Sequence, residues 1–350
     1  MKFLTPTLAL LTLWIDANAQ DHFVGKWDLM ITQRGFPMEG LLEIRDTDQG
    51  LIAHVEGGPA RLSIEGRDIE IGIDDRTAAG MPFERYLRGT LSEESIHGSF
   101  GPEVEASAEI KSLCERLPLA CPAPTGTWRA SRHVPAEPAT GENPVDLSGY
   151  WVVDVGGIRR WTADLTEAAK IWKAEFDVVM DLPAQRCQPT GLVLSWGFRG
   201  NEPEIFQSED KISMILGSKI RRIYLDGRRP PEYTPWYPMG FSAGHWEGST
   251  LVVKTTHLQP TVREWMGDPI SEEAVVIERY SIDDNGRLIG VLTLHDPRNY
   301  KQPMIKRVRW RKENDTRVRF PSLCDPDSFY QELHDDELLE EYWERSNRRY

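Results

Sequence analysis

Short segments in which apolar and polar residues alternate run through the first third of the chain. Apolar side chains at every second position are typical of a strand with one buried face. Turn signals such as Asp48-Gln-Gly50 and Asp74-Asp75-Arg76 separate the segments at close, regular intervals. Strands with this spacing predict an antiparallel barrel or sandwich. We expect strands at residues 26–32, 40–45, 51–55, 61–64, 69–73, 86–91 and 96–100.

Two glycine-and-tryptophan patterns bracket these segments. The first is Gly25-Lys-Trp27 and the second is Gly126-Thr-Trp128. Their spacing resembles the small lipocalin-like barrels that are attached to many exported bacterial proteins, and the likeness covers residues 21–133. Both tryptophans are expected in the core, because tryptophan buries a large apolar area.

A segment rich in proline and glycine, residues 135–144, marks a boundary because it has too few apolar residues to build a core. After it, Thr166 can cap a helix over residues 165–176. Further strands are expected at 249–257, 274–282, 287–295 and 304–312, with Asp284-Asn285-Gly286 as a hairpin turn. Leucine and aromatic residues among many acids predict a C-terminal helix over 327–343 that docks on the protein with its acidic face in solvent, rather than a partner-binding tail.

The sequence therefore predicts a mainly β protein with two antiparallel lipocalin-like barrels or partial barrels, a short helix and a C-terminal helix. The expected domains are a first barrel at 20–133, a linker at 134–146, a second barrel-like domain at 147–326 and a helical tail at 327–350.

Residues 1–19 have the features of a secretory signal. Lys2 precedes an apolar run that is too short to span a bilayer, and Ala17-Asn-Ala19 supplies small residues for cleavage before Gln20. No cysteine follows the cleavage site, so no lipid or other membrane anchor is expected. We expect a periplasmic or secreted protein.

Four cysteines agree with an oxidising compartment. Sequence alone allows three pairings. Cys114 and Cys121 flank a short loop and are the expected pair, which leaves Cys187 to pair with Cys324. Metal binding is the rival interpretation, but no C-x-x-C motif and no histidine at ligand spacing support it. No metal site is predicted.

The formal net charge of −14 argues against partners such as nucleic acid or anionic membranes. The sequence has no G-x-S-x-G motif, no P-loop, no dinucleotide-binding glycine motif after a strand and no H-E-x-x-H motif. Covalent serine hydrolysis and nucleotide chemistry thus lack support, and no cofactor is predicted.

A strand through residue 223 carries the first candidate site. One face would present Arg222, Tyr224 and Asp226, and the other Arg221, Ile223 and Leu225. The first face could bind a carboxylate or polarise a carbonyl group, with the acid as base or orienting group. Alternatively, Ile223 and Leu225 face the core and the polar row faces water.

Two later strands carry further candidates. His257 would end the apolar face of the strand at 249–257, where it could be a general base near neutral pH or an ordinary core or surface histidine. Glu278 and Arg279 point to opposite faces of their strand. Because Glu278 would share its face with Val276 and Tyr280, it is the preferred acid or base. The alternative is a structural ion pair with an arginine such as Arg222 or Arg307.

An aromatic loop stiffened by proline follows the first candidate strand at residues 230–240. Its Trp236 and Tyr237 could cover an apolar ligand, or the loop could pack its aromatic residues against itself.

Four motifs together resemble a large family of exported bacterial proteins of unassigned function. They are Arg222-Ile-Tyr-x-Asp226-Gly-Arg228, Gly244-x-Trp-Glu-Gly-x-Thr-Leu-Val-Val253, Val276-Ile-Glu278-Arg279-Tyr280 and Asp296-Pro-x-x-Tyr300-x-x-Pro303. The match covers residues 147–324. The family usually has an acid at Lys254 and a histidine at Phe241. The resemblance implies a fold and a site region but no reaction.

These residues support three hypotheses. The first is a cofactor-independent isomerase, cyclase, lyase or hydratase for an apolar or aromatic small molecule. In it Glu278, Asp226 and His257 are acid–base groups. Arg222, Tyr224, Trp236, Tyr237 and Arg279 bind the substrate. The second is a non-catalytic carrier that uses the same pocket. The third is an envelope interaction protein that uses the first barrel.

Overall fold

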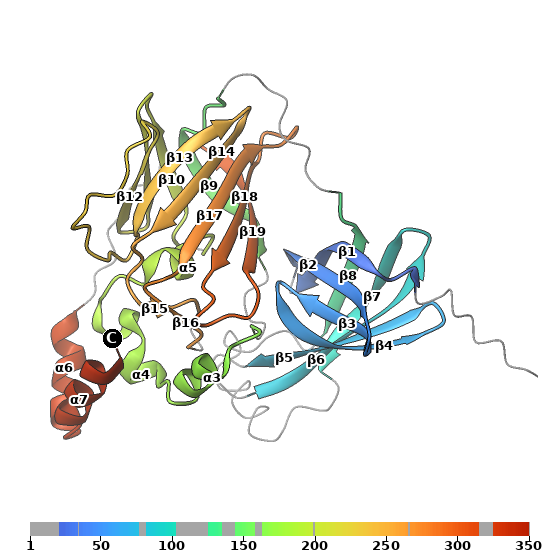
Figure 1. Ribbon diagram of the computed structural model, residues 1–350, viewed down its shortest axis with the longest axis horizontal. Helices are drawn as coiled ribbons and strands as arrows, with labels where there is room; N and C mark the ends of the chain where they lie inside the picture. The colour runs from blue at the N-terminus through green and yellow to red at the C-terminus, as the bar shows by residue number, and fades with distance from the viewer. Residues whose placement is uncertain are drawn as a thin grey trace, which may run out of the picture.

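The computed structural model describes residues 21–33, 35–76, 82–102, 125–134, 144–157, 163–198, 200–264, 267–314 and 325–349. They form two β-barrels that lie side by side, with short helices under the second barrel (Figure 1). The expected mainly β fold with two barrels is confirmed.

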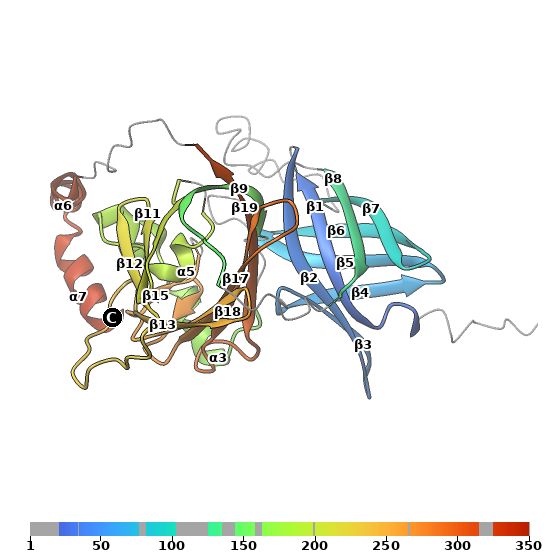
Figure 2. The ribbon, with the colours of Figure 1, turned by 90° about the horizontal axis from the view of Figure 1, so that it is seen from above.

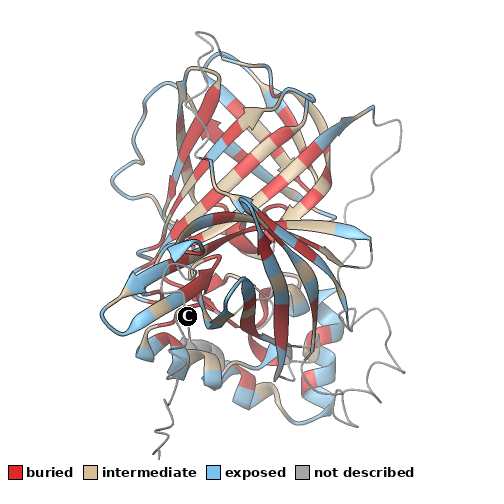
Figure 3. Ribbon diagram, turned by 90° about the vertical axis from the view of Figure 1, so that its right-hand side faces the viewer, coloured by how far each residue is buried: buried red, intermediate tan, exposed pale blue. Residues whose placement is uncertain are grey.

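The first barrel is a closed ring of eight strands. Each strand pairs antiparallel with the next, and β8 pairs with β1 to close the ring. Trp27 and Trp128 are buried in its core as expected. Figure 3 shows buried and exposed residues alternating along its strands, as the sequence pattern predicts. The strands are β1 (Gly25–Gln33), β2 (Phe36–Thr47), β3 (Gly50–Val55), β4 (Gly58–Glu65), β5 (Asp68–Arg76), β6 (Pro82–Ser92), β7 (Ser95–Pro102) and β8 (Gly126–Arg132).

The second barrel is a closed ring of nine strands in the order β9-β10-β11-β12-β13-β14-β17-β18-β19, with β19 pairing back to β9. The pairings are antiparallel except for β12 with β13, which is parallel and was not foreseen. A separate hairpin joins β15 (Thr261–Val262) to β16 (Pro269–Ile270). The ring strands are β9 (Gly149–Gly157), β10 (Pro203–Gln207), β11 (Lys211–Leu216), β12 (Lys219–Tyr224), β13 (Phe241–Glu247), β14 (Thr250–Thr256), β17 (Val275–Ile282), β18 (Leu288–His295) and β19 (Met304–Glu313).

Both barrels begin with the same local arrangement. Gly25 and Gly149 have φ angles of 127° and 126°, which residues with a Cβ rarely adopt. In each barrel the tryptophan two residues later donates its indole N–H to a carbonyl four residues before it. The distances are 2.8 Å from Trp27 Nε1 to the Phe23 oxygen and 2.9 Å from Trp151 Nε1 to the Leu147 oxygen. The turn therefore places a large core side chain at the start of each first strand.

Short helices close one end of the second barrel. The expected helix is α3 (Glu167–Ala174), and Thr166 caps it by accepting a hydrogen bond from the Ala169 N–H at 3.3 Å. After α4 (Val178–Asp181) and the 3-10 helix η1 (Pro183–Arg186), α5 (Gly191–Ser195) is buried at every residue. The barrel interior at this end is therefore filled by a helix.

The tail forms two helices, so the expectation of one continuous helix is wrong. They are α6 (Pro326–Asp335) and α7 (Leu339–Arg349), and Glu337 with a φ of 60° lies at the break. The two helices dock on Met180 of α4 through buried Phe329, Leu333 and Tyr342. Docking of the tail was expected.

The two barrels contact each other along β2 and β9, which pair in parallel at Met38 with Gly156 (Figure 2). Two ion pairs cross this contact. Glu39 pairs with Arg309, and Glu56 Oε1 lies 3.1 Å from Arg307 Nη1. The barrels are thus joined by backbone pairing as well as by the chain between them.

Several expectations concern residues outside the described ranges. They are the leader at 1–19, most of the linker at 134–146, and the cysteines Cys114, Cys121 and Cys324. Cys187 is described and is not a free thiol. Because Cys324 lies outside the described residues, the pairing of these two cysteines stays a prediction. None of the described helices has the length and apolar character that a bilayer crossing requires.

Candidate functional site

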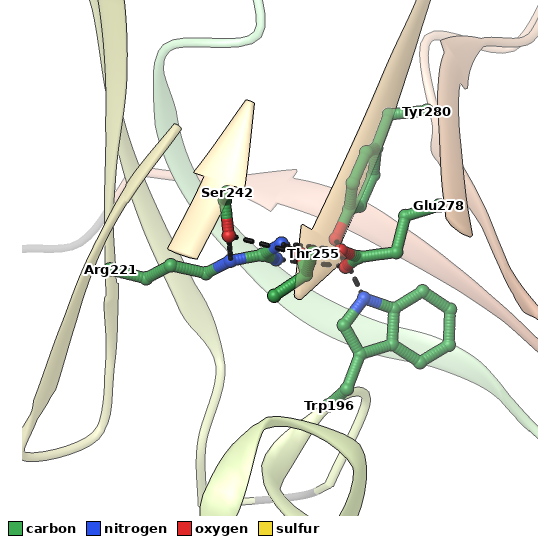
Figure 4. A network of polar contacts seen from close by, with 6 residues as sticks. All are labelled: Trp196, Arg221, Ser242, Thr255, Glu278 and Tyr280. Carbon is green, nitrogen blue, oxygen red and sulfur yellow. Dashed lines mark hydrogen bonds and ion pairs between the residues drawn. The ribbon is translucent and has the colours of Figure 1, made fainter. Parts of the chain in front are cut away.

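A buried ion pair lies inside the second barrel (Figure 4). Arg221 of β12 is 2% exposed and Glu278 of β17 is 0% exposed. Arg221 Nη1 donates to Glu278 Oε1 at 2.8 Å, and Nη2 donates to Oε2. Both side chains point inward because they alternate with outward-facing neighbours on their strands.

Four further side chains complete this network. Arg221 also donates to the hydroxyl oxygens of Ser242 at 3.0 Å and of Thr255 at 2.7 Å. Tyr280 donates to Glu278 Oε1 at 2.6 Å and accepts from the Trp196 indole N–H, also at 2.6 Å. Every nitrogen of the guanidinium group and both carboxylate oxygens therefore have partners, which a buried charged pair requires.

Burial and charge set the protonation of this network. Burial alone would lower the pKa of Arg221, but the adjacent Glu278 carboxylate raises it above its usual value. Burial, and then the charge of Glu278, raise the pKa of Tyr280 well above its usual value. Tyr280 therefore stays a neutral hydrogen-bond donor to Glu278.

A cavity of about 1270 Å³ extends along β12, from the β11–β12 turn at Gly217 to Tyr224 at the other end of the strand. β12 and β13 pair only at Ile223 with Ser242 and at Tyr224 with Ala243, and we call this short contact the β12–β13 seam. β9 and β10 also pair at only two positions. The cavity has lining residues from both places, so it occupies the region where the wall of the barrel opens.

The lining combines aromatic rings with polar and cationic groups. Tyr224 and Phe241 stack across the seam with ring centroids 5.6 Å apart, and Tyr237 lies beside them on the lining. The described lining residues that can carry charge are Glu202, Lys219, Arg221 and Arg222, together with the tyrosines. Such a mixture of apolar walls and a few polar groups is typical of small-molecule sites.

The buried network reaches the cavity only through Arg221 and Ser242. Thr255, Glu278, Tyr280 and Trp196 are not among the described lining residues. Glu278 faces the barrel interior as expected, but it is held in the structural ion pair that was the alternative interpretation. The partner is Arg221, not Arg222 or Arg307.

The structure does not bring the three predicted acid–base residues together. Asp226 lies near the surface and forms an ion pair with Arg228, whose guanidinium also covers the Tyr224 ring at 4.3 Å. The expectation that His257 continues the apolar face of its strand is wrong, because β14 ends at Thr256 and His257 has a φ of 56°. His257 instead bonds through Nδ1 to the Thr256 hydroxyl at 2.9 Å.

Three of the five predicted binding residues do line the cavity, namely Arg222, Tyr224 and Tyr237. Trp236 is 54% exposed and Arg279 pairs with Glu247 at 2.8 Å on the outer surface, and neither is part of the lining. The predicted roles of all five residues in binding stay predictions.

The sequence reasoning missed Arg221, Ser242 and Lys219. A signal for Arg221 existed, because it shares a strand face with Ile223, and a core-facing Ile223 requires a core-facing Arg221. The same alternation puts Lys219 on the face of Arg221 and Ile223. Ser242 gave no signal, since its parallel pairing with Ile223 joins strands separated by a long loop.

The described residues include no group of three or more His, Cys, Asp or Glu side chains that could hold a metal ion.

Comparisons with known proteins add little to this picture. No protein-family model matches the chain, and no curated protein matches it. Among solved structures, one match is a protein of unknown function of the DUF3598 family from Nostoc punctiforme. It is 7% identical, with 83% of this chain and 97% of that chain covered, at a TM-score of 0.24. A likeness this weak carries no argument, and the family resemblance of the motifs stays a prediction.

Proposed function

We propose that the protein binds an apolar or aromatic small molecule in the cavity beside the β12–β13 seam and acts as a binding or carrier protein. The observation that carries the proposal is the cavity itself, with Tyr224, Phe241 and Tyr237 on its lining. Its volume of about 1270 Å³ is large enough for a drug-sized molecule. The leader predicted from the sequence favours a role outside the cytoplasm.

The position of Glu278 favours binding over the catalytic hypothesis. A general acid or base must come within hydrogen-bond reach of the substrate. Glu278 lies behind Arg221, and its Oε1 already accepts hydrogen bonds from Arg221 and Tyr280. An enzyme that used Glu278 would have to break this buried network in each turnover.

The test uses N-phenyl-1-naphthylamine, a neutral aromatic probe whose fluorescence rises in apolar surroundings. We expect saturable binding at one site. Tyr237→Ala should weaken binding about five-fold or more, because truncating an aromatic residue in a binding site costs about 1 kcal/mol or more.

Tyr233→Ala is the matched control. Tyr233 belongs to the same loop, is 88% exposed and is not part of the described lining, so its removal should leave the affinity unchanged. Absence of saturable binding by the wild-type protein, or equal effects of the two substitutions, would contradict the proposal.

A further inference from the structure

The cavity presents more positive than negative charge. Arg221 is neutralised by Glu278. Lys219 and Arg222 also line the cavity, and no carboxylate within the described ranges lies within ion-pair distance of either. Glu202 is the one described acid on the lining, and it accepts a hydrogen bond from the Gly200 N–H at 3.0 Å. An excess of cations is unexpected in a chain with a net charge of −14.

Lys219 is the cation that lies toward the inside. It shares its strand face with Arg221 and Ile223, which are both buried, whereas Arg222 is on the opposite, exposed face. Lys219 Nζ donates to the amide oxygen of Asn201 at 3.4 Å, which is a long hydrogen bond. Burial lowers the pKa of Lys219, since removing an ammonium group from water disfavours its charged form.

A partly buried ammonium group without a carboxylate gains from an anion supplied by a ligand. A hydrogen bond between charged groups in such surroundings is about twice as strong as one between neutral groups. The cavity of about 1270 Å³ that Lys219 lines has room for the apolar body of that ligand.

We infer that the natural ligand is an amphipathic organic acid whose anionic group binds Lys219 while its apolar or aromatic body lies in the same cavity. This inference rests on the proposed function and narrows its ligand class.

The test compares two probes that share one ring system and differ by a single anionic group. They are N-phenyl-1-naphthylamine and 1-anilinonaphthalene-8-sulfonate, which carries the same ring system with an added sulfonate. We expect the wild-type protein to bind the sulfonate about ten-fold or more tightly than the neutral probe, as charge-assisted hydrogen bonding suggests. Lys219→Met should remove this preference, and Lys219→Arg should keep most of it.

Lys254→Met is the control for a general charge effect. Lys254 is exposed on β14 and is not part of the cavity lining, so the preference should survive its replacement. Lys219→Gln is a second variant for the case that Lys219→Met folds poorly, because its amide can still bond to Asn201.

The ratio of the two affinities decides the outcome. The inference is overturned if the wild-type protein binds the two probes with equal affinity. It is also overturned if Lys219→Met and Lys219→Gln keep the preference for the sulfonate, or if these variants lose affinity for both probes equally. Binding of the neutral probe alone would leave the proposed function standing, whereas failure of both probes to bind the wild-type protein would contradict the function itself.

Discussion

Replacing Glu278 by glutamine leaves the Arg221 guanidinium inside the second barrel without its counter-ion. Glutamate and glutamine side chains are almost the same size, so the substitution removes the negative charge and creates no cavity. Arg221 is 2% exposed, so bulk water solvates its charge poorly once the carboxylate is lost. Breaking a buried ion pair in this way destabilises a protein by about 3–5 kcal/mol.

The expected change in melting temperature follows from the size of the barrel. For a domain of about 200 residues, 1 kcal/mol lowers the melting temperature by roughly 2–4 °C, so Glu278→Gln should lower it by roughly 6–20 °C. Arg221→Met should have an effect of similar size, because it leaves the carboxylate unpaired among buried groups.

The double variant Arg221→Met/Glu278→Leu separates pairing from packing. Replacing a whole buried pair by apolar residues is often neutral or stabilising. We therefore expect the double variant to be more stable than either single variant in urea unfolding followed by tryptophan fluorescence, to which Trp196 of the same network contributes. If the free energy lost in the double variant equals the sum of the two single losses, the pair is not coupled and the reasoning is refuted.

Three further predictions concern other parts of the chain. Burial raises the pKa of Glu56 to about 7 from its usual 4.5, so folding retains a proton and stability should fall as the pH rises from about 4.5 to 7. By linkage, the free energy of unfolding should fall by roughly 3 kcal/mol over this pH range. In urea titrations Glu56→Gln should reduce this pH dependence, and an unchanged pH profile would exclude Glu56 as its source. Gly290→Ala should destabilise the second barrel by about 1–3 kcal/mol in the same assay, because the new Cβ would lie 2.5 Å from the Trp310 ring. A variant as stable as the wild-type protein would count against this contact. Peptide mapping without reduction should recover Cys187 linked to Cys324, and a different partner for Cys187 would refute the pairing.

Much of the barrel architecture follows from local sequence signals. The alternation that predicts residues 69–73 as a strand appears in the structure as β5, with Ile69, Ile71 and Ile73 buried. The turn Asp284-Asn285-Gly286 lies between β17 and β18, and Gly286 has the φ of 72° that such a turn needs. Each signal acts within a few residues, and for that reason it can be recognised without knowing the fold.

The tail shows where a local signal was incomplete. The stripe of leucine and aromatic residues correctly indicates a docked helical segment, but it does not show that the helix stops at Glu337. The break lets Phe329 of α6 and Tyr342 of α7 meet edge to edge at 5.6 Å. That contact depends on the angle between two helices, which a periodic pattern in one helix does not encode.

The position of the candidate site depends on pairings that are distant in the sequence. After β12 the chain runs through the loop at 225–240 before it returns as β13, parallel to β12. The three strands β10, β11 and β12 pair well with each other, but they join the rest of the barrel through only two residue pairs on each side. Where pairing stops, the wall no longer closes, and the cavity is lined by residues from both edges of this three-stranded unit.

The same geometry explains why Arg221 is buried against Glu278 while Lys219 is left without a carboxylate. Arg221 is two residues from Ile223, which still pairs across the β12–β13 seam. The Arg221 side chain therefore reaches the packed interior and Glu278. Lys219 is two residues closer to the hairpin turn, beyond the paired part of the seam, and its ammonium group reaches only Asn201 among the described residues. Two cations on one strand face thus acquire different roles from a difference of two positions. One stabilises the barrel where it closes, and the other is available to a ligand where the barrel opens.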